Sequence, residues 1–360
     1  MLGLYIHIPF CKKKCNYCDF ISFENSEHII DNYLKFINKE IKLVNINDYK
    51  PDTIYVGGGT PSILTEQQIG TLFKIIYSNF NCGNIQEISY ECNPESLTET
   101  KLRILKDFNV NRLSIGLQSF NNKYLKILGR LHTTDKFTES FYQARNIGFD
   151  NINVDLIYGI PGQTLTDWKS ELKKIVNISP EHISVYPLTI EKGTKFYKNG
   201  IKINDDLQAD MYEYAINYLV KKGYEHYEIS NLGKIRCKHN QIYWKNEPYL
   251  GIGLNAVSYI DGIRRKNTDN INEYFAILEK NELPIIESEK LDSEKSSSER
   301  IILGLRLIEG IELMPDENKF ITKFEQLKQM GLIECINSRN RWKLTKRGIL
   351  LSNYVFSQLI

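Results

Sequence analysis

The chain has 360 residues, of which 42% are hydrophobic and 25% are charged, so it can bury a full core, and disordered and fibrous proteins are excluded. Its 46 Lys and Arg residues nearly balance its 44 Asp and Glu residues, for a formal net charge of +2. This balance supplies no bulk attraction for nucleic acid, and we expect no nucleic-acid partner.

The cysteine count indicates the cellular environment. The chain has seven cysteines, an odd number, and three of them fall within eight residues, which argues against a secreted disulfide framework. The start of the chain has no basic region followed by a long apolar run, and no apolar stretch is long enough to cross a membrane. We therefore expect the protein in the reducing cytoplasm.

The first 190 residues alternate short apolar runs with longer amphipathic runs. The short runs predict strands at residues 3–8, 53–56, 87–90, 112–116, 151–157 and 182–186. The amphipathic runs predict helices at residues 29–44, 65–79, 98–108, 136–147 and 166–176. Six strands separated by helices predict a parallel sheet that closes into a full or partial barrel.

Each predicted strand leads into a polar or glycine-rich segment. The residues that mark these segments are His7, Gly57 to Thr60, Glu91, Gln118, Asp155 and Tyr186. The carboxyl ends of the strands in a parallel barrel share one face, where active sites are built. We therefore expect these segments to converge on one mouth.

The pattern changes after residue 190. We expect a helix at 205–221, an alternating strand at 224–230, an aromatic and glycine-rich stretch at 239–259, and a polar linker at 287–299. These features divide the chain into a barrel at 1–190, an extension at 191–286 and a smaller, mainly helical, winged-helix-like domain at 287–360. A winged helix can bind DNA, but basic residues are not concentrated here, which favours a packing or lid role.

The cysteines at positions 11, 15 and 18 are the sharpest motif. Three thiolates on a short loop can hold three corners of an iron–sulfur cube and leave the fourth iron open to a substrate or cofactor. Structural zinc requires four closed ligands, usually from two separated pairs, and no second pair is present. A buried, inert cluster is a further alternative, although the lysines at 12–14 do not resemble core. The spacing favours iron–sulfur.

This triplet, following a first strand and with Tyr17 before its last cysteine, resembles the radical S-adenosylmethionine (SAM) superfamily. That resemblance implies an α/β fold with a partial (β/α)6, TIM-like barrel and a 4Fe-4S cluster whose open iron is chelated by SAM. The segments at 5–11 and 55–62 are similar to the oxygen-independent coproporphyrinogen III oxidase subfamily. The resemblance covers essentially the whole chain.

Two later segments indicate a branch of this subfamily. The segments at 223–231 and 237–244 resemble the HemW branch, whose His-Asn-x-x-Tyr-Trp signature is associated with heme. Proteins of this branch are regarded as heme chaperones that pass heme to client hemoproteins, often membrane respiratory enzymes. The related dehydrogenases carry a fourth cysteine where Phe20 stands, and a longer N-terminal arm. Both departures favour a chaperone.

The resemblance implies three sets of site residues and no catalytic residue. The cluster ligands are Cys11, Cys15 and Cys18. The SAM-binding residues are Tyr5, Tyr17, Gly58, Gly59, Thr60, Glu91, Gln118, Arg130 and Asp155. The heme-binding residues are His239, Asn240, Tyr243 and Trp244, with His239 as a candidate axial ligand and Cys237 as a competing thiolate.

Two functions are weighed against each other. The first is a heme chaperone that holds the cluster and SAM, and the second is a coproporphyrinogen III dehydrogenase that decarboxylates propionate side chains. A purely structural iron–sulfur site has little support, because three ligands leave a cluster open. The identity of the client, a homodimer and peripheral contact with a membrane all stay open.

Overall fold

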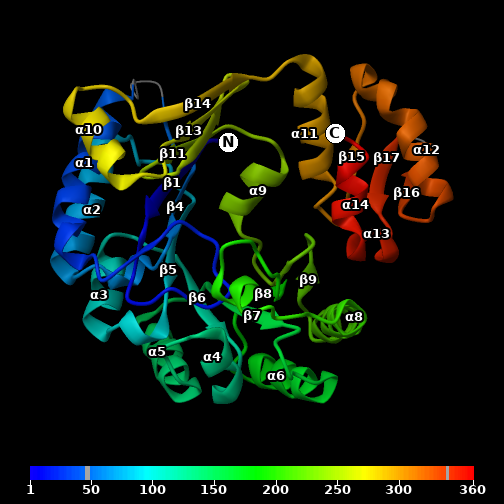
Figure 1. Ribbon diagram of the computed structural model, residues 1–360, viewed down its shortest axis with the longest axis horizontal. Helices are drawn as coiled ribbons and strands as arrows, with labels where there is room; N and C mark the ends of the chain where they lie inside the picture. Colours follow the sequence, from blue (N-terminus) through cyan, green and yellow to red (C-terminus); the bar gives the residue numbers. More distant parts are fainter. Residues whose placement is uncertain (45–48, 338–339) are drawn as a thin grey trace.

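The computed structural model describes residues 1–44, 49–337 and 340–360. The six predicted barrel strands are present, which confirms the expected α/β fold class. They are β1 (Gly3–Ile8), β4 (Thr53–Gly58), β5 (Glu87–Cys92), β6 (Arg112–Gln118), β7 (Ile152–Tyr158) and β8 (His182–Pro187). All neighbours in this order pair in parallel, so their carboxyl ends share one edge (Figure 1).

Helices follow these strands and cover the outside of the sheet (Figure 1). They are η1 (Glu27–Ile29), α1 (Ile30–Leu43), η2 (Pro61–Ile63), α2 (Glu66–Asn79), η3 (Pro94–Ser96), α3 (Glu99–Asp107), α4 (Asn122–Leu128), α5 (Thr134–Ile147) and α6 (Leu165–Ile178). A threonine hydroxyl caps α2, α3, α5 and α6 at the N-terminus. The sequence pattern missed α4, which is only seven residues long.

The sheet continues beyond the six strands on both sides. A seventh parallel strand, β11 (Tyr249–Ile252), pairs with β1. Antiparallel strands extend this edge as β12 (Val257–Ile260), β13 (Ile263–Asn267) and β14 (Ile285–Lys290), and the other edge as β10 (Asn231–Gly233) and β9 (Glu225–His226). The strand expected at 224–230 is therefore wrong in extent, because only two of its residues pair in the sheet.

The remaining elements before the C-terminal unit are short, except α8. They are β2 (Phe10–Cys11), β3 (Phe23–Glu24), α7 (Lys195–Lys198), α8 (Asp205–Lys221), α9 (Lys238–Trp244) and α10 (Ile271–Glu279). The helix expected at 205–221 is confirmed at α8. Within the described residues, we find no helix with the length and apolar character needed to span a membrane.

The polar stretch at 287–299 is not a linker, which corrects that expectation. Its first residues complete β14, and the rest begin α11 (Ser293–Gly304). The Asp292 carboxylate caps this helix by accepting hydrogen bonds from two backbone amides. Ser298 is buried and donates a hydrogen bond to the backbone of Leu359, so the serine-rich segment packs against the end of the chain.

The C-terminal residues form a unit with its own core beside the barrel (Figure 1). Its elements after α11 are β15 (Ile311–Glu312), η4 (Pro315–Phe320), α12 (Ile321–Gln329), β16 (Ile333–Asn337), β17 (Arg341–Leu344), α13 (Lys346–Leu350) and α14 (Ser352–Ser357). The indole of Trp342 packs edge-on against Phe324 in its centre. The expected division of the chain at 190 and 286 stays a prediction.

Candidate functional site

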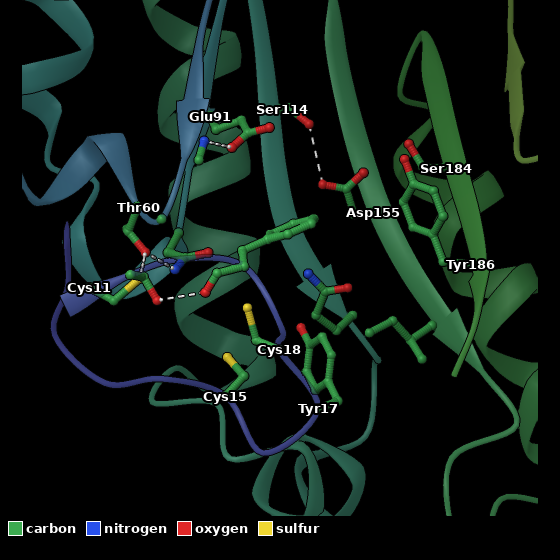
Figure 2. Close-up of a pocket in the computed structure, with 18 of the residues that line it drawn as sticks. Cys11, Cys15, Tyr17, Cys18, Thr60, Glu91, Ser114, Asp155, Ser184 and Tyr186 are labelled. Carbon is green, nitrogen blue, oxygen red and sulfur yellow. Dashed lines mark hydrogen bonds between the residues drawn. The ribbon is translucent and has the colours of Figure 1, made fainter. Parts of the chain in front are cut away.

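The three loop cysteines meet at the carboxyl ends of the barrel strands. Cys11 lies in β2, directly after β1, and Cys15 and Cys18 follow on the same loop. All three are free thiols that line one cavity of about 550 Å³, and Figure 2 shows their sulfur atoms facing the same space. The structure therefore brings together the three residues that the sequence predicted as cluster ligands.

The donor set at this loop fits an iron–sulfur cluster. All three side chains offer sulfur, and as ligands they would leave one corner of a cubic cluster without a protein ligand. In the described part of the chain, including this loop, no three His, Cys, Asp or Glu side chains are arranged to hold a single metal ion. Burial raises the pKa of the Cys18 thiol to about 11, and Arg130 donates a hydrogen bond to Cys15 Sγ at 3.4 Å.

The turn after β4 packs directly on the cysteine loop. A Cβ at Gly58, where φ is +117°, would lie 2.6 Å from the His7 ring, and a Cβ at Gly59 would lie 2.8 Å from the Phe10 carbonyl oxygen. Glycine is therefore required for this close approach. The amides of Gly58, Gly59 and Thr60 donate to Glu91, Ile8 and Phe10, respectively. A ligand at this turn would meet carbonyl oxygens.

Two carboxylates project into the cavity from β5 and β7, the strands on either side of β6 (Figure 2). Glu91 on β5 accepts hydrogen bonds from the Tyr55 hydroxyl at 2.8 Å and from the Gly58 amide at 3.0 Å. Burial raises the pKa of Glu91 to about 7 and also raises the pKa of Asp155 on β7. The Asp155 carboxylate accepts from Ser114 at 3.2 Å and from Asn153 at 2.8 Å.

Most of the other predicted SAM residues surround the same cavity. Arg130 donates to the Asn93 side chain at 2.5 Å and to the Gly116 carbonyl at 2.8 Å. Gln118 lies at the β6 bulge with φ of +71° and, like Tyr17, lines the cavity.

Tyr5 is set back from the cavity. Its hydroxyl lies 2.9 Å from His7 Nδ1, and its ring stacks on Tyr55 with 6.2 Å between ring centroids. His7 is buried, and burial lowers its pKa to about 4. His7 is therefore a packed residue beside the cysteine loop.

The segment associated with heme lies at the opposite end of the barrel strands. Glu87, the first residue of β5, accepts hydrogen bonds from the backbone amides of Lys238 and His239 at the start of α9. His239 Nδ1 lies 2.7 Å from the hydroxyl of Thr53, the first residue of β4. Since β4 and β5 have six residues each, roughly 17–20 Å separates this end from the cysteine loop.

The four predicted heme residues face different surroundings. His239 is 1% exposed, its Nε2 lies 2.9 Å from the Tyr243 hydroxyl, and burial lowers its pKa to about 3. Both of its ring nitrogens are thus engaged within the protein. Asn240 lines the barrel cavity, whereas Trp244 lines a second cavity of about 490 Å³ against the C-terminal unit.

The competing thiolate at Cys237 is also enclosed. Its side chain is fully buried, with Sγ 3.4 Å from a Glu87 carboxylate oxygen. Burial raises the pKa of this thiol to about 12. Cys237 is therefore held as a neutral thiol at the start of α9.

Sequence reasoning missed several polar residues that line the barrel cavity. They are Tyr55, Asn93, Arg112, Ser114, Asn153 and Ser184. Alternate residues of a strand point to the same face. Residues 112 and 114 of β6 are therefore expected on the same side as residue 118, which was already a predicted site residue. That alternation was a usable signal, because these polar residues occur in otherwise apolar strands.

Comparison with known proteins gives a consistent result. The family model for the radical SAM superfamily matches residues 5–175. The heme chaperone HemW of Lactococcus lactis subsp. lactis (strain IL1403) is 38% identical, with 99% of this chain and 96% of that protein covered. The heme chaperone HemW of Bacillus subtilis (strain 168) is 35% identical, with 100% of this chain and 99% of that protein covered.

A solved structure shares the fold. The chain is similar to the coproporphyrinogen III oxidase HemN of Escherichia coli, a radical SAM enzyme, with a TM-score of 0.86 and 24% identity. The similarity covers 99% of this chain and 89% of that chain. At this identity the likeness shows the fold alone.

Proposed function

The chain belongs to the HemW family of the radical SAM superfamily, and we propose that it is a heme chaperone that binds a 4Fe-4S cluster, SAM and heme and transfers heme to client hemoproteins. Three free thiols facing one cavity support the cluster. The cavity also contains carboxylates and an arginine, which suit the charged and hydroxyl groups of SAM.

Cys11, Cys15 and Cys18 would hold the cluster, which when bound offers SAM an open iron and a source of single electrons. Glu91 and Asp155 would accept hydrogen bonds from amino or hydroxyl groups of SAM. Further contacts would come from Tyr17, Gly58, Gly59, Thr60, Gln118 and Arg130, with Tyr5 supporting this wall from behind.

The side chain at position 20 is the observation that favours the chaperone function over the dehydrogenase function. In the related dehydrogenases this position holds a fourth cysteine, whereas Phe20 here lines the cavity with its side chain 64% exposed. A phenyl ring offers neither a thiolate nor a proton to a substrate at this edge. The proposal therefore includes no decarboxylation of coproporphyrinogen III.

We place the heme contact at α9. Asn240 presents an amide to the barrel cavity, and the Trp244 ring lines the neighbouring cavity beside Arg306, whose guanidinium lies 4.2 Å from the ring centroid. His239 and Tyr243 would position α9, because they are hydrogen-bonded to one another and His239 is hydrogen-bonded to Thr53 of β4. Ligation of heme iron by His239 would require its ring to leave these partners.

One experiment separates the two functions. The reconstituted full-length protein is incubated anaerobically with a reductant, SAM and coproporphyrinogen III, and protoporphyrinogen is measured, while a parallel sample is titrated with hemin. We expect stoichiometric hemin uptake and no protoporphyrinogen. Catalytic decarboxylation of the added substrate would overturn the chaperone proposal in favour of the dehydrogenase.

A further inference from the structure

Arg112 is a charged residue in the barrel cavity that the cluster and SAM do not use. It is the first residue of β6, its side chain is 2% exposed, and it lines the barrel cavity together with Asn153 and Asn240. It lies at the end of the strands where α9 packs. From there, the seven residues of β6 extend roughly 20 Å to Gln118 at the cysteine end.

The guanidinium of Arg112 has few hydrogen-bond partners. Its two terminal nitrogens lie 3.5 Å from Ser89 Oγ and 3.5 Å from His182 Nδ1, and its Nε has no partner. Both contacts are at the outer limit of hydrogen-bond length. A guanidinium has five donors, so most of its capacity is unused.

The contact with His182 is not a hydrogen bond. Asn153 Nδ2 donates to Asp155 and Ser114, so the Asn153 side-chain oxygen is an acceptor. That oxygen lies 2.6 Å from His182 Nδ1, which must therefore carry the ring proton. A protonated nitrogen cannot accept from Arg112, and only the Ser89 hydroxyl remains.

Arg112 also lacks an acidic partner in the described residues, since none of their carboxylates lies within 4.0 Å of it. Glu87 uses both carboxylate oxygens on the amides and thiol at the start of α9, and it also accepts from the Ser89 hydroxyl at 3.2 Å, which links it to Arg112 through one side chain. Glu91 and Asp155 are hydrogen-bonded to other cavity residues. A buried guanidinium that no carboxylate contacts directly keeps donors free for an anion that is supplied from outside the chain.

We propose that Arg112 forms a carboxylate-binding subsite at the α9 end of the barrel cavity, where it receives a propionate group of heme. The planar guanidinium matches a carboxylate in two parallel hydrogen bonds. SAM also has a carboxylate, but a SAM bound at the cysteine loop would hold it at the far end of β6. This inference rests on the proposed heme-chaperone function and names which part of heme enters the barrel.

The first test measures stability without ligand. We expect Arg112→Met to leave the thermal unfolding midpoint unchanged or raise it, because the variant removes a buried charge that no carboxylate contacts directly. The matched control is Arg145→Met, since Arg145 pairs with Glu181 at 2.7 Å and this variant should lower the midpoint. If Arg112→Met destabilises the protein as much as Arg145→Met, Arg112 has a structural role and the proposal is wrong.

The second test uses the reconstituted full-length protein with hemin, hemin dimethyl ester and SAM as separate probes. The wild type should bind hemin about tenfold more tightly than the ester, because the ester lacks the propionate charges. Arg112→Met should bind the two equally, and Arg112→Lys should restore part of the difference. Affinity for SAM should not change in either variant.

The outcomes separate this inference from the function on which it rests. If the wild type does not bind hemin, the proposed function and the inference both fail. If the wild type binds hemin but Arg112→Met keeps the same preference over the ester, only the carboxylate subsite fails. A loss confined to SAM would assign the carboxylate to SAM and would also overturn the subsite for heme.

Discussion

At the carboxyl ends of the barrel strands, thiols and carboxylates face a cavity, whereas at the amino ends a similar set of residue types is packed together. Cys11, Cys15 and Cys18 line the open space at the first end. At the second end, Cys237 and His239 bond to residues that begin β4 and β5. The same chemical groups therefore face a cavity at one end and stabilise the fold at the other.

The difference shows that residue type is a poor guide to role within this barrel. His239 resembles a metal ligand in sequence, but its two ring nitrogens already have protein partners. Nothing in the sequence marked Arg112 as a site residue. At the amino ends of the strands, however, most of its hydrogen-bond donors are unused. Four predictions test this contrast, beginning with the variants that should have the strongest effect.

The cluster ligands should give the largest effect. Cys11→Ala, Cys15→Ala and Cys18→Ala should each lose nearly all bound iron, because the proposed site has three protein ligands. Iron and sulfide analysis after anaerobic reconstitution measures this, and circular dichroism verifies that each variant is folded. Cys82→Ala is the control and should keep its iron, because Cys82 does not line the cavity. Full iron retention in any loop variant would contradict the assignment.

The close approach at Gly58 should give the next largest effect. Gly58→Ala combines a positive φ with a Cβ 2.6 Å from the His7 ring, whereas Gly148→Ala has φ of +96° and open space. Gly148→Ala should cost about 1–2 kcal/mol in free energy of unfolding, and Gly58→Ala about 2 kcal/mol more. Denaturant unfolding of the metal-free proteins checks this, and equal costs would show that the contact at Gly58 relaxes.

The bonds around His239 should give an intermediate effect on stability. Thr53→Val removes the partner of His239 Nδ1 and should cost about 1–2 kcal/mol, since it leaves a buried nitrogen unpaired. The absorption spectrum of bound heme should not change in this variant. Stability equal to the wild type, together with an altered heme spectrum, would instead indicate that His239 leaves its partners to bind iron.

The titration of Glu91 should give the smallest effect. Its pKa in the folded protein is about 7, raised from 4.5 by burial, so folding favours its protonated form. Without ligand, the contribution of Glu91 is fully present below about pH 4.5 and is lost as pH rises through about 7. Glu91→Gln should flatten this part of the stability–pH curve, measured by denaturant unfolding, by about 1 kcal/mol. An identical curve in the variant would contradict the raised pKa.

Local patterns in the sequence predicted much of the barrel. Alternating apolar runs located six of the seven parallel strands of the large sheet, and α8 was predicted with its observed bounds. The spacing of the three cysteines also indicated a shared site, because a short loop keeps them together wherever it lies. These features depend on neighbours within a few residues.

Local patterns failed where packing decided the structure. Residues 287–299 are polar and resemble a linker, yet Asp292 starts a helix there and Ser298 is buried against the chain end. The position of the segment from Cys237 to Trp244 in the barrel was not predicted, because its backbone amides bond to Glu87, 152 positions away from His239 in sequence.

Local spacing and contiguous motifs were enough to predict the order of strands and helices, the cysteine loop and the family resemblance. Which polar residues keep free hydrogen-bonding capacity depends instead on contacts between distant parts of the chain. His239 and Thr53 are 186 positions apart, and Arg112 and His182 are 70 apart. Whether such groups satisfy one another or remain available to a ligand depends on distances that arise only when the sheet closes around them.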